Sequence, residues 1–190
     1  MMRRFLLFAV AALALAGCDT PPHRQNFPDV TFQHLQPFRL DVAHVEIVEA
    51  YHPDPANDIA DQFPEAPQKV AKQWGMDRLQ AVGTSGEAIY TITLAQATDT
   101  GLHRSQGMSA VTNKDQSDRY DLRITVNLEV RSGSGSGAVT AQAARSQTVA
   151  EDMTLNQREG VLFDLLDATM KDLNAQMEQL IPQYLGGFLR

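Results

Sequence analysis

The chain has 190 residues, of which 43 % are hydrophobic, 21 % charged and 7 % aromatic, a composition typical of a single globular domain. Sixteen Lys and Arg against 23 Asp and Glu give a net charge of -7, which argues against nucleic-acid binding because that needs a basic surface. The single cysteine excludes a disulfide framework, and no apolar run reaches the roughly 20 residues of a membrane-spanning helix.

Residues 1–17 have the features of a secretory signal peptide. Arg3 and Arg4 supply positive charge, and an apolar run follows at residues 5–15, too short to span a bilayer. The segment ends in Leu-Ala-Gly-Cys at residues 15–18, which resembles the lipobox of bacterial lipoproteins. Because Cys18 is the only cysteine in the chain, we interpret it as a lipidation site and not as an incidental cysteine after an ordinary signal peptide.

Lipidation of Cys18 predicts a protein in the cell envelope, anchored to a membrane and facing the periplasm. Removal of the signal peptide takes away Arg3 and Arg4 and brings the net charge to -9. Asp19 resembles the signal that retains lipoproteins in the inner membrane, so that membrane is slightly favoured over the outer one. Residues 18–37 are polar and contain four prolines, which predicts a tether at least in their N-terminal part. Residues 38–190 are expected to form one domain.

The first half of that domain begins with a predicted strand at residues 38–50, in which the alternation of apolar residues changes phase and indicates a bulge or bend. A proline-rich loop follows. A helix is predicted from Pro67 to Val82, since proline suits the first helical position and apolar residues recur at helical spacing. Residues 87–97 are predicted to form the second strand.

The second half contains the clearest strand, residues 119–131, where apolar and polar residues alternate throughout. A Gly-Ser linker at residues 132–137 leads to a predicted hairpin partner at residues 138–149. A long helix is expected at residues 155–181, with Thr154 and Gln157 as a capping box. The order β-α-β-β-β-α predicts an α+β fold, a four-stranded, mostly antiparallel sheet with two helices on one face.

No pattern indicates catalysis, a cofactor or a metal. His44 and Glu46 lie two apart on a strand, where a solvated polar face explains them better than a metal site. The glycines at 133, 135 and 137 lack the Lys-Ser/Thr of a phosphate-binding loop and precede a strand. The aspartates at 54, 58 and 61 lie in the proline-rich loop, which predicts solvated carboxylates. We therefore expect a protein that is not an enzyme.

Two segments are candidates for contact with a partner or a lipid. The first is the loop at residues 100–119, where His103, Arg104, Lys114 and Arg119 place positive charge in an acidic chain; a plain solvated loop is the alternative. The second is the apolar C-terminal tail with Tyr184 and Phe188, which either packs on its own domain or docks on another protein.

The arrangement of lipobox, polar tether and β-α-β-β-β-α domain resembles the LPS-assembly lipoprotein and the auxiliary lipoproteins of ABC-type lipid transporters. Several short segments are also similar to a lipoprotein group of alphaproteobacteria: Gln62-Phe63-Pro64, Trp74-x-x-x-Arg78-Leu79-x-x-Val82-Gly83, Asp118-Arg119-Tyr120-Asp121 and Arg145-Ser146-x-Thr148-Val149. The resemblance covers most of residues 38–181. It implies a non-enzymatic protein that binds a transport component or a lipid.

The sequence thus predicts an accessory lipoprotein of envelope lipid or LPS transport or maintenance, bound to the membrane through Cys18 and contacting a transport protein or lipid. The alternative is a stand-alone periplasmic lipid- or ligand-binding module. That module would need an apolar cavity of a few hundred Å³ between the sheet and the helices. Mutual contact of Trp74, Leu128 and Leu166 in a solid core would argue against it.

Overall fold

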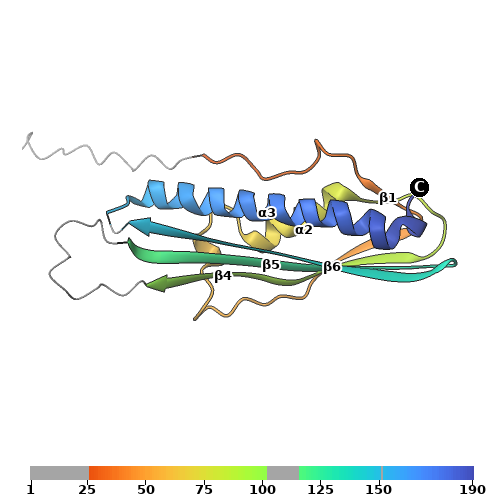
Figure 1. Cartoon of the computed structure of the whole chain (residues 1–190), viewed down its shortest axis with the longest axis horizontal. Coiled ribbons are helices and arrows are strands. Elements are labelled where there is room, and N and C mark those ends of the chain that lie inside the picture. The colour runs from red at the N-terminus through yellow and green to blue at the C-terminus, as the bar shows by residue number, and fades with distance from the viewer. Residues whose placement is uncertain (1–25, 102–115, 151) are drawn as a thin grey trace, which may run out of the picture.

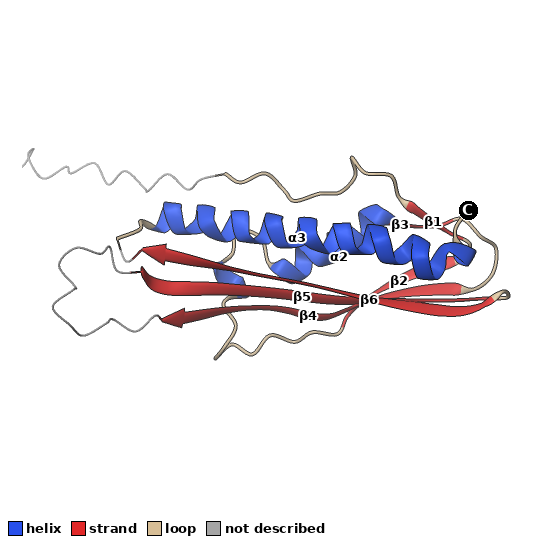
Figure 2. Ribbon diagram, in the orientation of Figure 1, coloured by secondary structure: helices blue, strands red, loops and turns tan. Residues whose placement is uncertain are grey.

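The computed structural model describes residues 26–101, 116–150 and 152–190. A four-stranded sheet has the order β2 (His44–Glu49), β4 (Glu87–Gly101), β5 (Gln116–Ser132) and β6 (Gly135–Ala150). A small second sheet pairs β1 (Phe38–Leu40) with β3 (Leu79–Ala81). The helices α2 (Pro67–Arg78) and α3 (Leu155–Leu185) cover one face of the large sheet (Figures 1 and 2). The predicted fold class is confirmed.

The large sheet is mixed. β4 pairs antiparallel with β5, and β5 pairs antiparallel with β6, each over most of its length. β2 lies parallel to β4 because the connection between them contains α2, and a crossover of this length is what parallel neighbours require. Two of the three pairings are therefore antiparallel, as the prediction of a mostly antiparallel sheet expected.

β5 is the central strand and follows its predicted alternation. One set of alternate residues is fully or almost fully buried under the helices: Tyr120, Leu122, Ile124, Val126, Leu128 and Val130. The residues between them lie on the opposite face, which no helix covers (Figure 1). On β4 a register shift between Ile92 and Leu94 adds one residue, so the buried face continues through Ala95 and Ala97. This bulge was not predicted.

The predicted single strand at residues 38–50 is wrong in one respect, because the structure divides it between the two sheets. β1 pairs with β3, whereas β2 pairs with β4. Val42, between them, is fully buried, and its N–H donates to Leu40 O at 2.8 Å, which turns the chain. The change of phase in the apolar pattern marks this turn and not a bulge within one strand.

The predicted helix at residues 67–82 ends four residues early, at Arg78. Residues 79–81 become extended because they pair with β1, and Leu79 is buried there. Gly75 remains inside α2 for a packing reason. A Cβ atom at this position would lie 2.9 Å from Cδ1 of Tyr90, so a side chain would push the helix away from the sheet.

α3 begins with the predicted capping box, in which Thr154 Oγ1 accepts from the N–H of Gln157 and the Gln157 side chain accepts from the N–H of Thr154. The helix continues past its predicted end at residue 181 and through Pro182 to Leu185. Ile181 and Leu185 are fully buried, and we infer that this burial compensates for the hydrogen bond that proline cannot make.

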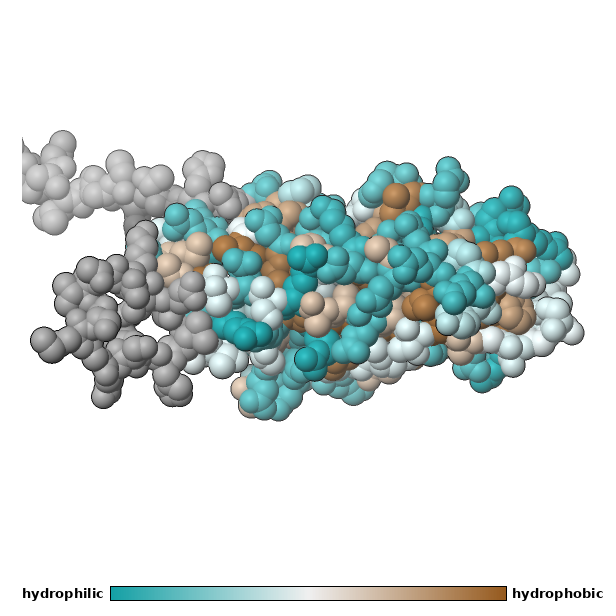
Figure 3. Space-filling model, viewed as in Figure 1, coloured by the Kyte–Doolittle hydropathy of each residue, from teal (hydrophilic) through white to brown (hydrophobic). Residues whose placement is uncertain are grey.

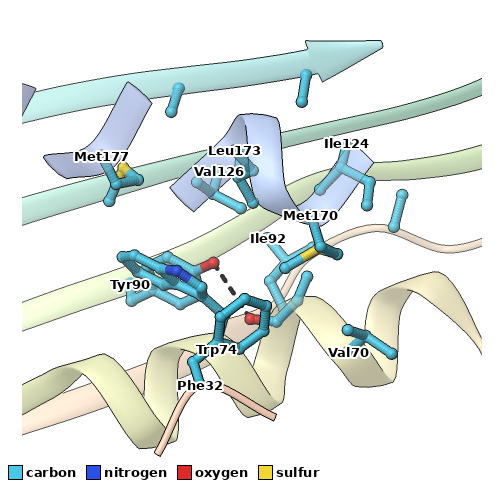
Figure 4. Close-up of a cluster of buried hydrophobic side chains, with 14 of the residues drawn as sticks. Phe32, Val70, Trp74, Tyr90, Ile92, Ile124, Val126, Met170, Leu173 and Met177 are labelled. Atoms are coloured by element: carbon cyan, nitrogen blue, oxygen red, sulfur yellow. Dashed lines mark hydrogen bonds between the residues drawn. The ribbon is translucent and has the colours of Figure 1, made fainter. Parts of the chain in front are cut away.

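The space between the sheet and the helices is filled with side chains. Trp74 of α2 stacks on Tyr90 of β4 with ring centroids 5.4 Å apart, and Tyr90 Oη donates to Ala71 O at 3.2 Å. From α3, Met170 and Met177 close the same cluster, as Figure 4 shows. Burial raises the pKa of Tyr90 far above its ordinary value of 10.0, so its hydroxyl stays neutral. Trp74, Leu128 and Leu166 are each fully buried in this core.

Candidate functional sites

The first described residues hold the N-terminal segment against the helical layer. Phe27 stacks on Phe163 of α3 at 5.0 Å between ring centroids. The N–H of Phe32 donates to Asp77 Oδ2 of α2 at 2.8 Å, and Phe32 is buried. Cys18 lies outside the described residues, eight positions before Asn26. Because an extended residue spans at most about 3.6 Å, the lipidated residue lies within about 30 Å of this point.

Three of the predicted contact residues, His103, Arg104 and Lys114, lie outside the described residues. The fourth, Arg119, is on β5. Its guanidinium donates to Asp121 Oδ1 at 2.8 Å and to Ser146 Oγ of β6 at 2.9 Å, on the face of the sheet away from the helices. Arg119 is therefore already part of a cross-strand polar pair, but its side chain remains about half exposed.

The apolar C-terminal tail packs on its own domain. Phe188 O accepts from the N–H of Asp41 at 2.7 Å, and Leu189 forms an isolated bridge with Leu40. Arg190 closes the contact with an ion pair to Asp41 at 2.8 Å. Tyr184 is 60 % exposed, so of the two predicted tail residues it is the accessible one, while Phe188 is partly buried.

Of the predicted contact residues that the structure describes, Arg119 lies far from Tyr184 and Phe188. Arg119 lies at the end of the large sheet where β4 and β5 join residues 102–115. Tyr184 and Phe188 lie at the other end, beside Gly137 and the β5–β6 turn. Figure 3 shows that the surface between these ends is mostly hydrophilic on the side of α3, with apolar residues scattered among polar ones.

A polar cluster that the sequence did not reveal surrounds Arg158 at the first of these ends. Its Nη1 atom lies 2.8 Å from Tyr120 Oη and 3.4 Å from Asp118 Oδ2. Partial desolvation and the neighbouring Asp118 raise the pKa of Asp99, which the positive charge of Arg158 partly offsets. Burial raises the pKa of Tyr120 as well. This cluster joins the start of α3 to the ends of β4 and β5.

The aspartates of the proline-rich loop do not converge on a reaction site. Asp58 is buried and accepts the Tyr51 hydroxyl at 2.5 Å, together with the N–H groups of Ala60 and Ala97. Burial and the hydrogen bond to Asp58 raise the pKa of Tyr51. A half-open cleft of about 690 Å³ lies beside this loop and the end of β4. Asp58 therefore fastens the loop to the sheet, and the prediction of a solvated carboxylate is wrong at this position.

The segment Trp74-x-x-x-Arg78 has a structural counterpart on α3. Trp74 Nε1 donates to Asn174 Oδ1 at 3.0 Å, and Arg78 Nη2 donates to Glu178 Oε1 at 2.9 Å. The two donors are four residues apart on α2 and the two acceptors are four residues apart on α3. Each pair therefore lies on one face of its helix, and the two faces contact each other. Arg78 also donates to Gln36 O and lies 4.7 Å above the Phe38 ring. The two hydrogen bonds between α2 and α3 join residues that are 100 positions apart in the chain.

His44 and Glu46 are exposed on β2, on the sheet face away from α2. In the described ranges, no group of three or more His, Cys, Asp or Glu is arranged to hold a metal ion. In the same ranges, no helix is both long enough and apolar enough to span a membrane.

Comparison with known proteins supports the interpretation of the N-terminal residues as a lipid attachment site. Residues 2–18 match the family described as prokaryotic membrane lipoprotein lipid attachment site. Comparison with curated proteins finds no match. A minor lipoprotein from Acinetobacter baumannii is similar in structure, with 18 % identity, a TM-score of 0.35, and coverage of 75 % of this chain and 92 % of that one.

A second similar structure is the rare lipoprotein B from Shewanella oneidensis. It has 10 % identity and a TM-score of 0.33, over 72 % of this chain and 98 % of that chain. The attachment site, which ends at Cys18, supports anchoring of this chain to an envelope membrane as a lipoprotein.

Proposed function

We propose that this lipoprotein is a non-enzymatic accessory component of envelope lipid or LPS transport or maintenance, which holds a rigid binding surface beside the membrane. The observation that carries the proposal is the combination of a lipid-attachment site with an interior that is already filled. A short link restrains the body near the bilayer, and the layer between sheet and helices is occupied by its own side chains.

The filled interior favours surface contact over enclosure of a ligand. A stand-alone lipid-binding module would require an apolar cavity in the layer where Trp74, Tyr90 and Met170 are fully buried. The cleft beside the proline-rich loop and a second cleft, between β6 and α3, lie at the margins of the body. We therefore assign partner or lipid contact to Arg119 at one end of the sheet and to Tyr184, next to Phe188, at the other, together with His103, Arg104 and Lys114 of the segment that joins β4 to β5.

The proposal can be tested in cells of the source organism that lack the chromosomal copy. The full-length chain is restored as wild type, as Cys18→Ala, as the charge reversal Arg104→Glu with Lys114→Glu, or as Tyr184→Ala. The readouts are LPS at the cell surface and entry of a large antibiotic that an intact envelope excludes. We expect wild type to restore both and Cys18→Ala to fail.

Lys69→Glu provides a matched control, since Lys69 is 72 % exposed on α2 and lies away from the proposed contact residues. We expect the charge-reversal and Tyr184 variants to impair the envelope while Lys69→Glu does not. Normal surface LPS and normal exclusion in the absence of the protein would refute the transport role. Equal effects of the contact variants and Lys69→Glu would refute the assignment of the contact residues.

A further inference from the structure

β6 forms one edge of the large sheet over its full 16 residues. In the described part of the chain, no strand pairs with its outer side, as Figure 1 also shows. An edge strand presents a row of backbone N–H and C=O groups to which another strand can pair. Proteins usually cover or block such a row.

The hydrogen bonds of Gln142 show which backbone groups face outward. Its N–H donates to Gln176 Oε1 at 3.1 Å, and its C=O accepts from Gln176 Nε2 at 2.9 Å. A side-chain amide of α3 therefore takes the place of a neighbouring strand at this position. The β5–β6 register is regular from residue 136 to residue 149, so Ala144, Ser146 and Thr148 also direct their N–H and C=O groups outward.

On the other side of the sheet, β4 extends beyond the short edge strand β2. Where β2 ends, the chain stays beside β4: the N–H of Tyr51 donates to Ile92 O at 3.1 Å. Further along, Ala97 O accepts from the N–H of Ile59 at 2.9 Å, and the N–H of Ala97 donates to Asp58 Oδ1 at 3.3 Å. The fold thus satisfies the backbone of β4 where it extends beyond β2, and leaves residues 144–148 of β6 open, apart from a 3.4 Å contact of Gln147 Nε2 with Thr148 O.

The open stretch lacks the features with which proteins usually block an edge. β6 contains no proline and no lysine, and the stretch 144–148 has no bulge. Its one charge, Arg145, is on the side of α3 and binds Asp172 through two hydrogen bonds of 2.6 and 3.0 Å. The side chains on the other face of this stretch are small and uncharged.

A cleft of about 300 Å³ lies at the same stretch, between the edge of β6 and α3. Arg145 and Gln147 line it from β6, and Val161, Asp164, Leu165 and Ala168 line it from α3. The Asp164 carboxylate has no ion pair or hydrogen bond among the described residues. A strand added to the edge would cover this cleft and bring its own side chains beside an unpaired carboxylate.

We propose that residues 144–148 of β6 pair antiparallel with the same residues of a second copy of this chain. With Ser146 on the two-fold axis, Ala144 lies opposite Thr148 of the partner subunit, and Arg145 lies opposite Gln147 of the partner subunit. No like charges then meet across the seam. Each copy also brings its Arg145 toward the cleft of the other, which Asp164 lines, so the pairing is complementary in charge as well as in backbone.

The short contact makes this association depend on the membrane. Five residues of strand bury far less surface than the 1,200–2,000 Å² or so of a stable interface. Lipid anchors confine both copies to one surface and raise their effective concentration. Exposed charges of the two copies that are farther apart than about 8 Å, the Debye length at physiological ionic strength, are largely screened, so the net negative charge opposes the association only weakly. The inference is independent of the proposed transport role.

A single introduced cysteine tests this proposal in intact cells. Because Cys18 is the only cysteine and carries the lipid, Ser146→Cys in the full-length chain has one free thiol. Residues opposite each other in a hydrogen-bonded antiparallel pair have Cα atoms about 5.5 Å apart, within the range that a disulfide bridges. After mild oxidation we expect a reducible band at twice the mass of the chain.

Thr140→Cys is the matched control. Like Ser146, Thr140 is an exposed hydroxyl residue of β6 that bonds a β5 side chain, Asn127, at 3.0 Å. In the proposed register, the two copies of residue 140 lie twelve residues apart along the seam, about 40 Å, so we expect no crosslink. A homodimer band of equal strength from both cysteines would indicate random collision and overturn the proposal.

Adding Ala144→Pro to Ser146→Cys supplies a second readout. The N–H that proline removes faces outward and has no partner in the monomer, so the fold is expected to tolerate the change. The crosslink should be lost while thermal unfolding followed by Trp74 fluorescence stays cooperative. A persistent crosslink would overturn the proposal, as would a monomeric Ser146→Cys chain or a band containing a different protein.

Discussion

Replacing Glu178 by glutamine should destabilise the protein, because Glu178 is the counterion of a buried cation. The Arg78 side chain is only 3 % exposed, whereas that of Glu178 is 46 % exposed. Burial lowers the pKa of Arg78 from its ordinary value, but the group stays charged at neutral pH. Its Nε atom has no hydrogen-bond partner among the described residues, so the loss of Glu178 would leave the guanidinium with fewer compensating contacts.

The size of the effect follows from the two exposures. Removing one partner of a fully buried ion pair costs about 3–5 kcal/mol, since the remaining charge stays desolvated. Water reaches the carboxylate of Glu178, and Arg78 retains its hydrogen bond to Gln36 and its contact with the Phe38 ring. We therefore expect Glu178→Gln to reduce the free energy of unfolding by about 1–2 kcal/mol. At this chain length each kcal/mol lowers Tm by about 2–4 °C.

Urea unfolding followed by fluorescence measures this loss directly, because Trp74 is the only tryptophan and is fully buried. A double-mutant cycle with Arg78→Met isolates the pair, and we expect a coupling energy of about 1 kcal/mol or more. Glu159→Gln, near the other end of α3, is the control and should change stability little. A coupling energy below about 0.3 kcal/mol would show that Glu178 does not compensate the charge of Arg78.

Two further substitutions test the contacts of β6 with α3. Gly137→Ala would place a Cβ atom 2.7 Å from Leu185 Cδ2, so we expect a loss of about 1–3 kcal/mol in urea unfolding, and unchanged stability would show that the end of α3 shifts freely. Asp172→Asn removes the ion pair with Arg145, whose hydrogen bonds hold the pKa of Asp172 below its ordinary value of 3.8. A lowered pKa means that this contribution is present above pH 3.8 and disappears as the pH falls through the folded-state value. The variant should therefore have a Tm about 1–2 °C lower than that of the wild type at pH 7 and low salt, and the same Tm as the wild type at a pH below the folded-state pKa of Asp172. A difference in Tm that does not change with pH would contradict the ion-pair explanation.

Features of the fold that depend on neighbouring residues were predictable from the sequence. Alternation at residues 119–131 identifies the buried face of β5, because every second side chain of a strand lies on the same side. The capping box at Thr154 and Gln157 is equally local, since both hydrogen bonds close within one helical turn. The lipid attachment site that ends at Cys18 was predictable for the same reason, because it is one short continuous segment of the sequence.

Partly predictable features are those in which a local pattern had two solutions. The change of phase within residues 38–50 correctly indicated an irregularity, but only pairing of β1 with β3 and of β2 with β4 shows that the chain changes sheets there. The apolar tail was compatible with packing or with docking, and its contact with Asp41 and Leu40 is a tertiary fact.

The tertiary structure alone decided the contacts between residues that are far apart in the chain. Nothing near Arg78 indicates that Glu178 neutralises it, and nothing near Gln142 indicates that Gln176 occupies its outward backbone groups. The physical reason is that charge compensation and hydrogen-bond satisfaction depend on distance in space. The sequence by itself therefore determined where the chain is attached and which strand face is buried, whereas folding determined which backbone groups of the β6 edge remain open.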